Sequence, residues 1–245
     1  MFKTKESIWL NEIPMPDFLI IAGCNHDITG SIEHDIVDIP GYKGINIRST
    51  KKNPRSIVID FKYRDSGFLT YEKKEKISSW IHSNNLKSCK LELSWIPGSY
   101  YLVVPNGDTG LDDKPKIKSF SLEFLLVNPC RIENEEVVKT SSFTYIGTES
   151  TYPSLELSID SACSKIKLEF SNTLDSGFIE LNASFNAGDK ITINCQKKSI
   201  KVNGRDSMPI LSIDSDFPKI ETGWNDYRMT AGNATLKISY NNMYR

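Results

Sequence analysis

Three Asp-Ser/Thr-Gly triplets are the most chemically suggestive pattern in this sequence: Asp65–Gly67, Asp108–Gly110 and Asp175–Gly177. Aspartic proteases use two such carboxylates that share one proton, because two adjacent anions are costly to form together. Those enzymes carry a small residue after the glycine, whereas Phe68 and Phe178 follow two of the triplets here. Each triplet also lies between strand-like segments, and Asp and Gly are the usual residues of tight turns. We therefore interpret all three as hairpin turns.

The three histidines, His26, His34 and His82, all lie in the first half of the chain. Acidic residues such as Asp27 and Glu33 neighbour the first two, which would suit a metal site of two histidines and one carboxylate. Their spacing matches no known ligand motif, so we expect solvated loop histidines. The sequence also lacks GxSxG, P-loop and GxGxxG motifs. We predict no catalytic, cofactor-binding or metal-binding residue, and no enzymatic activity.

Two aromatic residues near the C-terminus, Trp224 and Tyr227, could stack on a sugar ring, since an aromatic face is an apolar platform with a polar rim. The simpler interpretation is that one of them packs into a β core or a domain seam, as most aromatics in β proteins do.

The segments that would position these residues alternate between apolar and polar side chains, the pattern of half-buried strands. They cover residues 55–63, 91–95, 119–126, 154–159, 165–170, 178–181, 190–194 and 235–240. Turn residues separate them about every ten residues, which favours an antiparallel sandwich or barrel. Residues 71–83 differ, because Ile77, Trp80 and Ile81 have helical spacing. We therefore predict a mainly β protein with one helix.

Composition sets further limits. The 245 residues are 39% hydrophobic, enough for a globular core, and 30 basic side chains balance 31 acidic ones. This balance predicts no specific nucleic-acid binding, which requires clustered phosphate contacts. Five widely spaced cysteines favour reduced thiols over a disulfide scaffold. Since no segment reaches the roughly 18 to 20 apolar residues of a membrane span, we expect no membrane insertion.

A domain boundary is predicted between Pro129 and Thr144. Asn128 and Pro129 are typical of a strand end, and residues 131–142 are polar and charged without a sustained period. Strands mix with a helix before this stretch, whereas strands and turns alone follow it. We predict two domains, residues 1–133 and residues 134–245.

The order of features resembles the distal tail protein family of long-tailed, non-contractile bacteriophages (siphophage tail components). In the first half the resemblance lies in residues 36–41, 56–63, 77–81, 96–103 and 120–129. In the second half it lies in residues 152–157, 185–193, 202–204 and 215–220, followed by Gly223 and Asn225.

The resemblance implies a structural virion protein at the distal tip of the phage tail, made in the host bacterial cytoplasm. Such proteins form a homo-hexameric ring, alone or stacked in pairs, that joins the tail tube protein to the tail-associated hub protein and the host-adhesion device with its receptor-binding proteins. It further implies that residues 1–133 are a ring-forming β-sandwich or split-barrel domain with one α-helix, and residues 134–245 a galectin-like jelly-roll β-sandwich.

Sugar binding does not follow from the galectin likeness, because fold does not carry function. Galectins hold sugar with a His, an Arg and a Trp-Gly-x-Glu stretch, whereas the second half here has no histidine and reads Glu221-Thr-Gly-Trp224. We therefore carry over no sugar-binding residue. The alternative function is a carbohydrate-binding β-sandwich module of a cell-wall-associated protein, which would be monomeric and bind glycans saturably.

Overall fold

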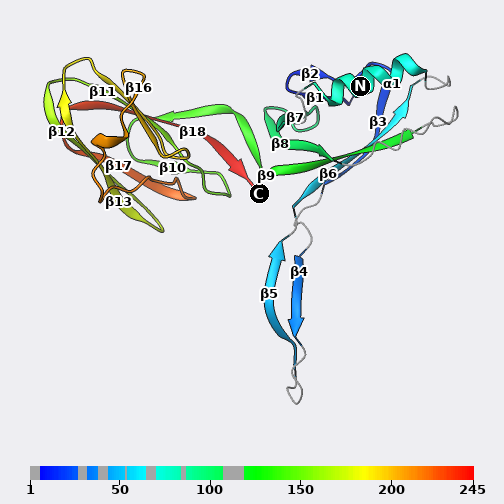
Figure 1. Cartoon of the computed structure of the whole chain (residues 1–245), viewed down its shortest axis with the longest axis horizontal. Helices are drawn as coiled ribbons and strands as arrows, with labels where there is room; N and C mark the ends of the chain where they lie inside the picture. Colours follow the sequence, from blue (N-terminus) through cyan, green and yellow to red (C-terminus); the bar gives the residue numbers. More distant parts are fainter. Residues whose placement is uncertain are drawn as a thin grey trace. The chain divides into compact units, whose positions relative to one another are not determined.

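The computed structural model describes residues 6–26, 32–37, 44–52, 54–64, 70–83, 87–106 and 119–245. The chain divides into two compact units, Met1–Arg131 and Ile132–Arg245, and Figure 1 labels most of their elements. The described residues are mainly strands with a single α-helix, which confirms the predicted fold class. The galectin likeness of the second half stays a prediction.

The first unit is built on strands that meet at β9. Strands β3 (Leu19–His26) and β6 (Ser56–Tyr63) pair antiparallel, and β6 continues to the first part of β9 (Ser119–Lys139). Along the other direction β9 is followed by β8 (Ser99–Asn106), β7 (Cys89–Leu93), β1 (Ile8–Leu10) and β2 (Ile13–Pro14). The sequence pattern places apolar side chains on one face of these strands, and that face is buried.

Helix α1 (Tyr71–Ile81) packs on the core of this unit through the three residues that predicted it, Ile77, Trp80 and Ile81. Trp80 meets the ring of Phe61 edge-on, with 6.2 Å between centroids, and its indole Nε1 donates to the carbonyl of Ile13 at 3.1 Å. Thr70 caps the helix by accepting from the amide of Lys73. The predicted stop at Asn84 and Asn85 lies outside the described residues.

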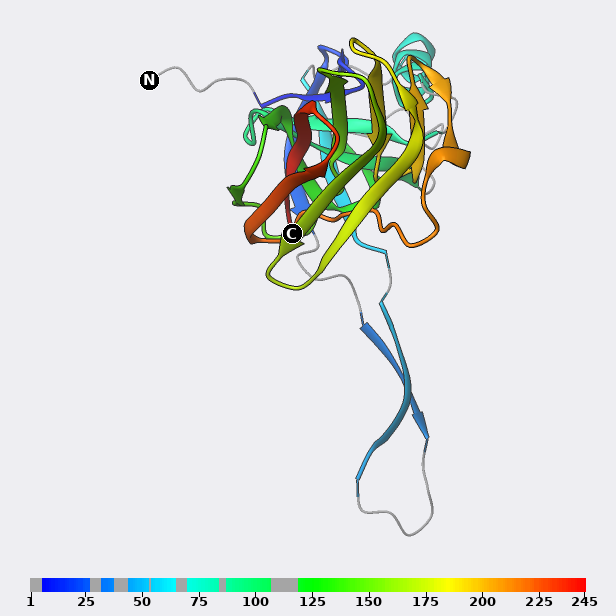
Figure 2. The same ribbon diagram turned by 90° about the vertical axis from the view of Figure 1, so that its left-hand side faces the viewer.

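The second unit is a β-sandwich of two sheets. The back sheet contains β11 (Ser154–Ile159), β14 (Lys190–Asn194), β15 (Ser199–Val202), β16 (Arg205–Asp206) and β18 (Ala234–Tyr244). The front sheet has the order β10 (Phe143–Tyr145), β17 (Gly223–Ala231), β12 (Cys163–Asn172) and β13 (Ser176–Phe185). A short 3-10 turn, Met208–Ile210, precedes β17. Figure 2 shows the β12–β13 hairpin, drawn in yellow-green.

The core of the sandwich lies between the two sheets and contains the inward side chains of every strand pattern predicted in this half. Ile166, Leu168 and Phe170 come from the front sheet, and Leu155 and Leu157 from the back sheet. The polar residues that alternate with these apolar ones face solvent, because successive side chains of a strand point to opposite faces of the sheet. This separation fixes which residues form the solvent face of the front sheet.

The prediction that Asn128 and Pro129 end a strand is wrong, since β9 runs unbroken from Ser119 to Lys139. Side chains form hydrogen bonds with the backbone of Pro129 and of Cys130. The Arg55 guanidinium donates to the Pro129 carbonyl at 2.8 Å, and the Asn128 side chain accepts from the amide of Cys130 at 3.0 Å. Beyond residue 131, the Asn241 side chain of β18 donates to the Glu133 carbonyl at 3.0 Å.

All five cysteines are free thiols, as predicted, and Cys89, Cys130 and Cys195 are buried. Burial raises the pKa of the Cys195 thiol to about 12, so this side chain acts as a small core residue. Among the described residues, no helix is long and apolar enough to cross a membrane.

Candidate interaction surfaces

The described Asp-Ser-Gly triplet, Asp175–Gly177, is part of the β12–β13 hairpin turn, as predicted. The Asp175 carboxylate accepts from the amide of Ser176 at 2.8 Å, and the Asn172 side chain accepts from the amides of Leu174 and Asp175. These contacts lock the turn rather than prepare a carboxylate for catalysis. Asp65–Gly67 and Asp108–Gly110 lie outside the described residues.

Two of the histidines lie on strands, so the prediction of loop histidines is wrong for them. His26 ends β3 and meets the ring of Tyr101 edge-on at 5.0 Å, whereas His34 on β4 (Ile32–Val37) lies 3.0 Å from the Thr50 hydroxyl. His82 follows α1, with its Nδ1 2.8 Å from the Ser78 carbonyl. Asp27 lies outside the described residues. Within the described part of the chain, no group of three metal-ligating side chains comes together.

The structure separates Trp224 from Tyr227, although both belong to β17. Tyr227 points into the sandwich core, where its ring stacks on Phe143 at 6.1 Å. Trp224 points the other way, and 56% of its surface is exposed. The reason is the strand period, since residues an odd number of positions apart face opposite sides. Only Trp224 is available to a ligand.

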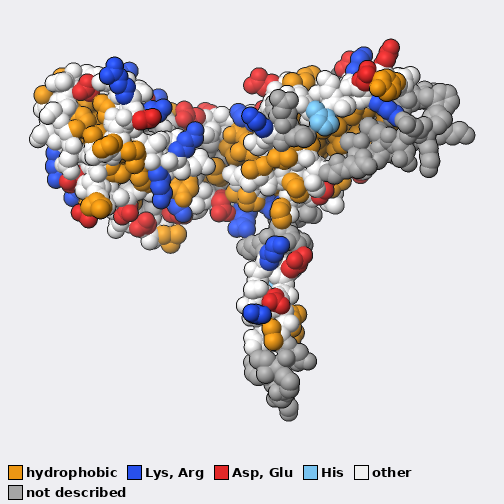
Figure 3. Space-filling view, in the orientation of Figure 1, with side chains coloured by type: hydrophobic (Ala, Val, Ile, Leu, Met, Phe, Trp, Pro, Cys, Tyr) orange, Lys and Arg blue, Asp and Glu red, His pale blue; other side chains and the backbone are white. Residues whose placement is uncertain are grey.

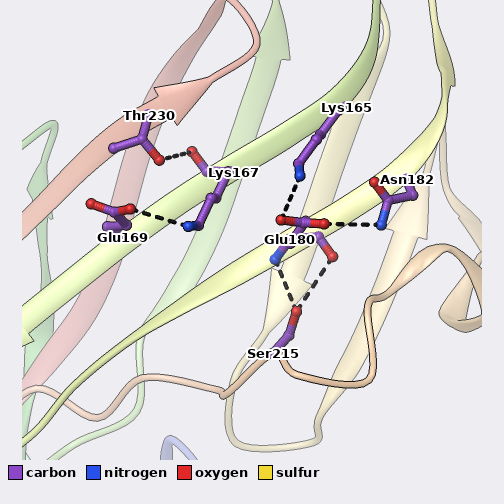
Figure 4. Close-up of polar contacts among 7 residues, drawn as sticks. All are labelled: Lys165, Lys167, Glu169, Glu180, Asn182, Ser215 and Thr230. Carbon is purple, nitrogen blue, oxygen red and sulfur yellow. Dashed lines mark hydrogen bonds and ion pairs between the residues drawn. The ribbon is translucent and has the colours of Figure 1, made fainter.

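The solvent face of the front sheet, here called the front face, carries an ordered network of polar side chains (Figure 4). Lys165 forms a 2.8 Å ion pair with Glu180, and Asn182 donates to the same carboxylate at 3.2 Å. These two contacts hold the pKa of Glu180 below its usual range. Lys167 forms a second ion pair with Glu169 at 3.3 Å. The front face therefore has fixed charges rather than free side chains.

The outer edge of the front sheet is covered by a segment of the same unit. The amides of Ser212 and Asp216 donate to the carbonyls of Glu180 and Phe178, each at 2.9 Å. Ser215 reinforces this contact, because its hydroxyl accepts from the amide of Glu180 at 2.9 Å (Figure 4). Strand β13 is consequently not an open edge at this point.

A groove of about 380 Å³ lies on the front face beside this network. Antiparallel register brings its walls together: Glu169 of β12 stands opposite Arg228 of β17 and Phe178 of β13. One step along, Ser171 stands opposite both Asp226 and Ser176. Small serines flanked by large side chains leave the hollow, which we call the Phe178 groove.

The side chains of the Phe178 groove are held in place by their neighbours. The Lys167 ammonium lies 4.4 Å from the centroid of the Phe178 ring, a cation–π distance. The Ser142 hydroxyl donates to the Asp226 carboxylate in a short hydrogen bond. Within the described residues, the side chain of Arg228 has no hydrogen bond or ion pair, and it is exposed. Its guanidinium donors are available to a ligand.

The first unit has a different kind of surface in the hairpin of β4 and β5 (Asn46–Lys52). Within the described residues these strands form a sheet of their own. Ile36 and Ile47 stand opposite each other and are 57% and 50% exposed. Figure 3 shows hydrophobic side chains on this hairpin among charged ones. A two-stranded sheet with exposed isoleucines is marginally stable alone, which indicates a surface completed by another molecule.

A second groove, of about 510 Å³, belongs to the first unit and lies between β2 and α1. Its walls are mostly apolar and include Ile13, Pro14, Phe18 and Trp80, with Lys76 at the rim. Neither this groove nor the Phe178 groove was predicted. Each is assembled from segments far apart in the sequence, and no local pattern marks it.

Two family models match the chain in succession. Residues 21–126 match the phage tail protein RIFT-related domain, and residues 146–244 match the C-terminal domain of the siphovirus-type tail component. The first match covers most of the first unit, and the second covers most of the second unit.

Individual known proteins are also similar to this chain. The distal tail protein of Bacillus phage SPP1 is 23% identical over 133 residues, a segment that spans about half of each protein (51% of this chain and 51% of that one). The crystal structure of the SPP1 Dit protein, described as a paradigm of the hub adsorption apparatus in phages of Gram-positive hosts, aligns with a TM-score of 0.80 and 18% identity over 98% of this chain and 99% of that one. A chain of the activated phage p2 baseplate aligns with a TM-score of 0.48 and 11% identity over 96% of this chain and 97% of that one.

Proposed function

Because the chain belongs to the distal tail protein family of siphoviruses, we propose that it is a structural protein of the phage tail tip, where it forms a ring that joins the tail tube to the tail hub and the host-adhesion device. The observation that carries this function is the succession of two tail-component domains along one chain. The ring is a homo-hexamer, alone or stacked in pairs, and the protein has no enzymatic role. Its place is the virion, after synthesis in the host cytoplasm.

The first unit, with the β4–β5 hairpin, builds the ring. Hairpins with unpaired edges and exposed apolar side chains favour pairing with another chain, and a head-to-tail contact between identical copies forms a ring when the rotation between copies closes. The apolar groove between β2 and α1 offers each copy a further contact surface. These features support self-association through the first unit, whereas the second unit has its own closed core and a covered sheet edge.

Mass photometry and light scattering of the full chain test the ring directly. We expect a particle of about six times the 27.7 kDa chain mass, or about twelve times that mass for a stacked pair of rings. Introducing charge on the hairpin, in the double variant Ile36→Asp and Ile47→Asp, should reduce it to monomers, because a desolvated carboxylate opposes burial. The matched control Asn46→Asp adds charge to the same hairpin opposite Val37, next to the isoleucine pair but on the other face, and should preserve the ring.

A monomeric full chain, both alone and in the presence of the tail tube protein of its phage, would contradict the ring. A ring that survives the double hairpin variant would leave the family assignment in place and transfer the assembly contact to another surface.

A further inference from the structure

The front face of the second unit combines features that no structural role in the sandwich requires. Trp224 exposes 56% of its surface, and Asp226 on the same strand lines a groove together with Glu169, Phe178 and Arg228. Trp224 and Asp226 are two positions apart on β17 and therefore lie on the same face of the sheet. An exposed indole offers a flat aromatic face on which another molecule can stack.

We propose that this face binds a neutral saccharide, with Trp224 as the stacking platform and the Phe178 groove as the site for its hydroxyl groups. The inference does not depend on the proposed ring function. It differs from the galectin likeness in resting on residues that no galectin motif supplied.

Charge indicates a neutral ligand. The groove and its rim carry two carboxylates, Glu169 and Asp226, and two cations, Lys167 and Arg228, so the formal charges cancel. Phosphate groups or nucleic acid would require an excess of basic side chains, which this face lacks. A strongly apolar ligand would leave the carboxylates and the guanidinium desolvated without partners.

The hydrogen-bonding groups match a polyhydroxylated ring. Hydroxyl groups both donate and accept, so they can donate to the carboxylates of Glu169 and Asp226 and accept from the Arg228 guanidinium. The C–H face of a pyranose is apolar and can lie on the indole of Trp224, whose own N–H adds a polar rim. The groove volume of about 380 Å³ is at the small end of the range for small-molecule sites.

The side chains of the groove are held in place before any ligand binds, which is typical of a binding site. Lys167 is held between Glu169 and the Phe178 ring, and Ser142 orients Asp226. Groups fixed before binding lose little conformational entropy when the ligand arrives. A peptide that extends the sheet is disfavoured because the segment around Ser212 and Asp216 already pairs with the edge of β13.

Saturation-transfer difference NMR on the full chain tests the proposal, since it detects weak ligands and works well on large proteins and assemblies. The probes are glucose, galactose, N-acetylglucosamine and N-acetylgalactosamine, each added alone. We expect transfer to the C–H protons of at least one of them, and binding about tenfold weaker in Trp224→Ala, the scale of one lost aromatic platform. Arg228→Ala should weaken the same probe.

Two variants serve as matched controls, one for the loss of an indole and one for the loss of a guanidinium. Trp95→Ala removes an indole that is 39% exposed in the first unit, and Arg205→Ala removes an exposed guanidinium of the back sheet. Both variants should bind the saccharide like the unmodified protein. Unchanged thermal unfolding of Trp224→Ala confirms that the variant folds, and an unchanged oligomer mass separates this test from that of the ring.

Absence of transfer to all four probes would overturn the proposal, as would transfer that Trp224→Ala and Arg228→Ala leave unchanged. If the saccharides fail and Trp224→Ala instead abolishes binding of another tail protein, the front face is a protein interface and the saccharide site is refuted.

Discussion

In the second unit, alternation along a strand places side chains that are close in sequence in different environments. Tyr227 and Trp224 lie three positions apart, and one is buried while the other faces water. Burial raises the pKa of the Tyr227 hydroxyl well above its ordinary value, and within the described residues this hydroxyl has no hydrogen-bond partner. A buried donor without a partner loses its hydration and gains nothing in return.

Tyr227→Phe should therefore stabilise the protein, by about 1 kcal/mol in the free energy of unfolding, since it removes the unpaired hydroxyl and keeps the ring that stacks on Phe143. Denaturant unfolding of the full chain measures the change. Tyr145→Phe is the matched control, because the Tyr145 hydroxyl donates to the Glu149 carbonyl and accepts from the Met243 amide, each at 2.9 Å. That control should be destabilising, and equal effects of the two variants would refute this account.

At the scale of elements, the β12–β13 pair of the front sheet contributes a pH-dependent stability. The Lys165 ion pair and the Asn182 hydrogen bond lower the pKa of Glu180 from its ordinary value of 4.5. A carboxyl whose pKa is lowered by folding stabilises the folded state above its ordinary pKa. That contribution is lost as the pH falls through the lowered value, because protonation breaks the ion pair.

Glu180→Gln should consequently lower the thermal unfolding midpoint at pH 7, and the difference from the unmodified protein should shrink as the pH falls below about 4.5. Calorimetry across this range measures it. Glu136→Gln, at an exposed position of β9, controls for the loss of one negative charge. A Glu180→Gln deficit that stays constant down to pH 3 would show that the ion pair is not its source.

The length of strand β9 also determines where the chain can be cut into two folded fragments. Strand β9 crosses the boundary between the units, so a cut within residues 134–139 would damage the second unit. Asn242 donates to the Glu133 carboxylate at 2.8 Å, and Asn241 donates to the Glu133 carbonyl. The end of β9 thus completes the back sheet beside β18.

For the whole molecule, we predict that residues 132–245 fold alone as a monomer, because their core is complete without the first unit. A shorter piece, residues 140–245, should unfold at a clearly lower temperature, since it lacks the partners of Asn241 and Asn242. Circular dichroism melts of the two fragments make the comparison, and mass photometry gives their masses. Identical melts would show that the end of β9 contributes nothing, and oligomers of residues 132–245 would assign the ring contact to the second unit.

Sequence by itself determined the elements whose pattern is local. Helix α1 and strands such as β11, β12 and β14 follow from the spacing of their apolar residues, because each buries one face against a core. The turn role of Asp175 and the free thiols were also predicted, since turn chemistry and cysteine spacing are properties of short segments.

Only the tertiary structure decided which strands lie side by side. Glu169, Phe178 and Arg228 come from three strands, and β17 reaches its place between β10 and β12 from far along the chain. The carbonyl of Pro129 in the middle of β9 accepts a hydrogen bond from Arg55, which is 74 positions away. Strand pairing and hydrogen bonds to the backbone of this kind are contacts between residues far apart in the sequence. The period of apolar residues along the sequence shows only which face of a segment is apolar. The Phe178 groove therefore depends on the register between the strands, and no single segment of the sequence predicts it.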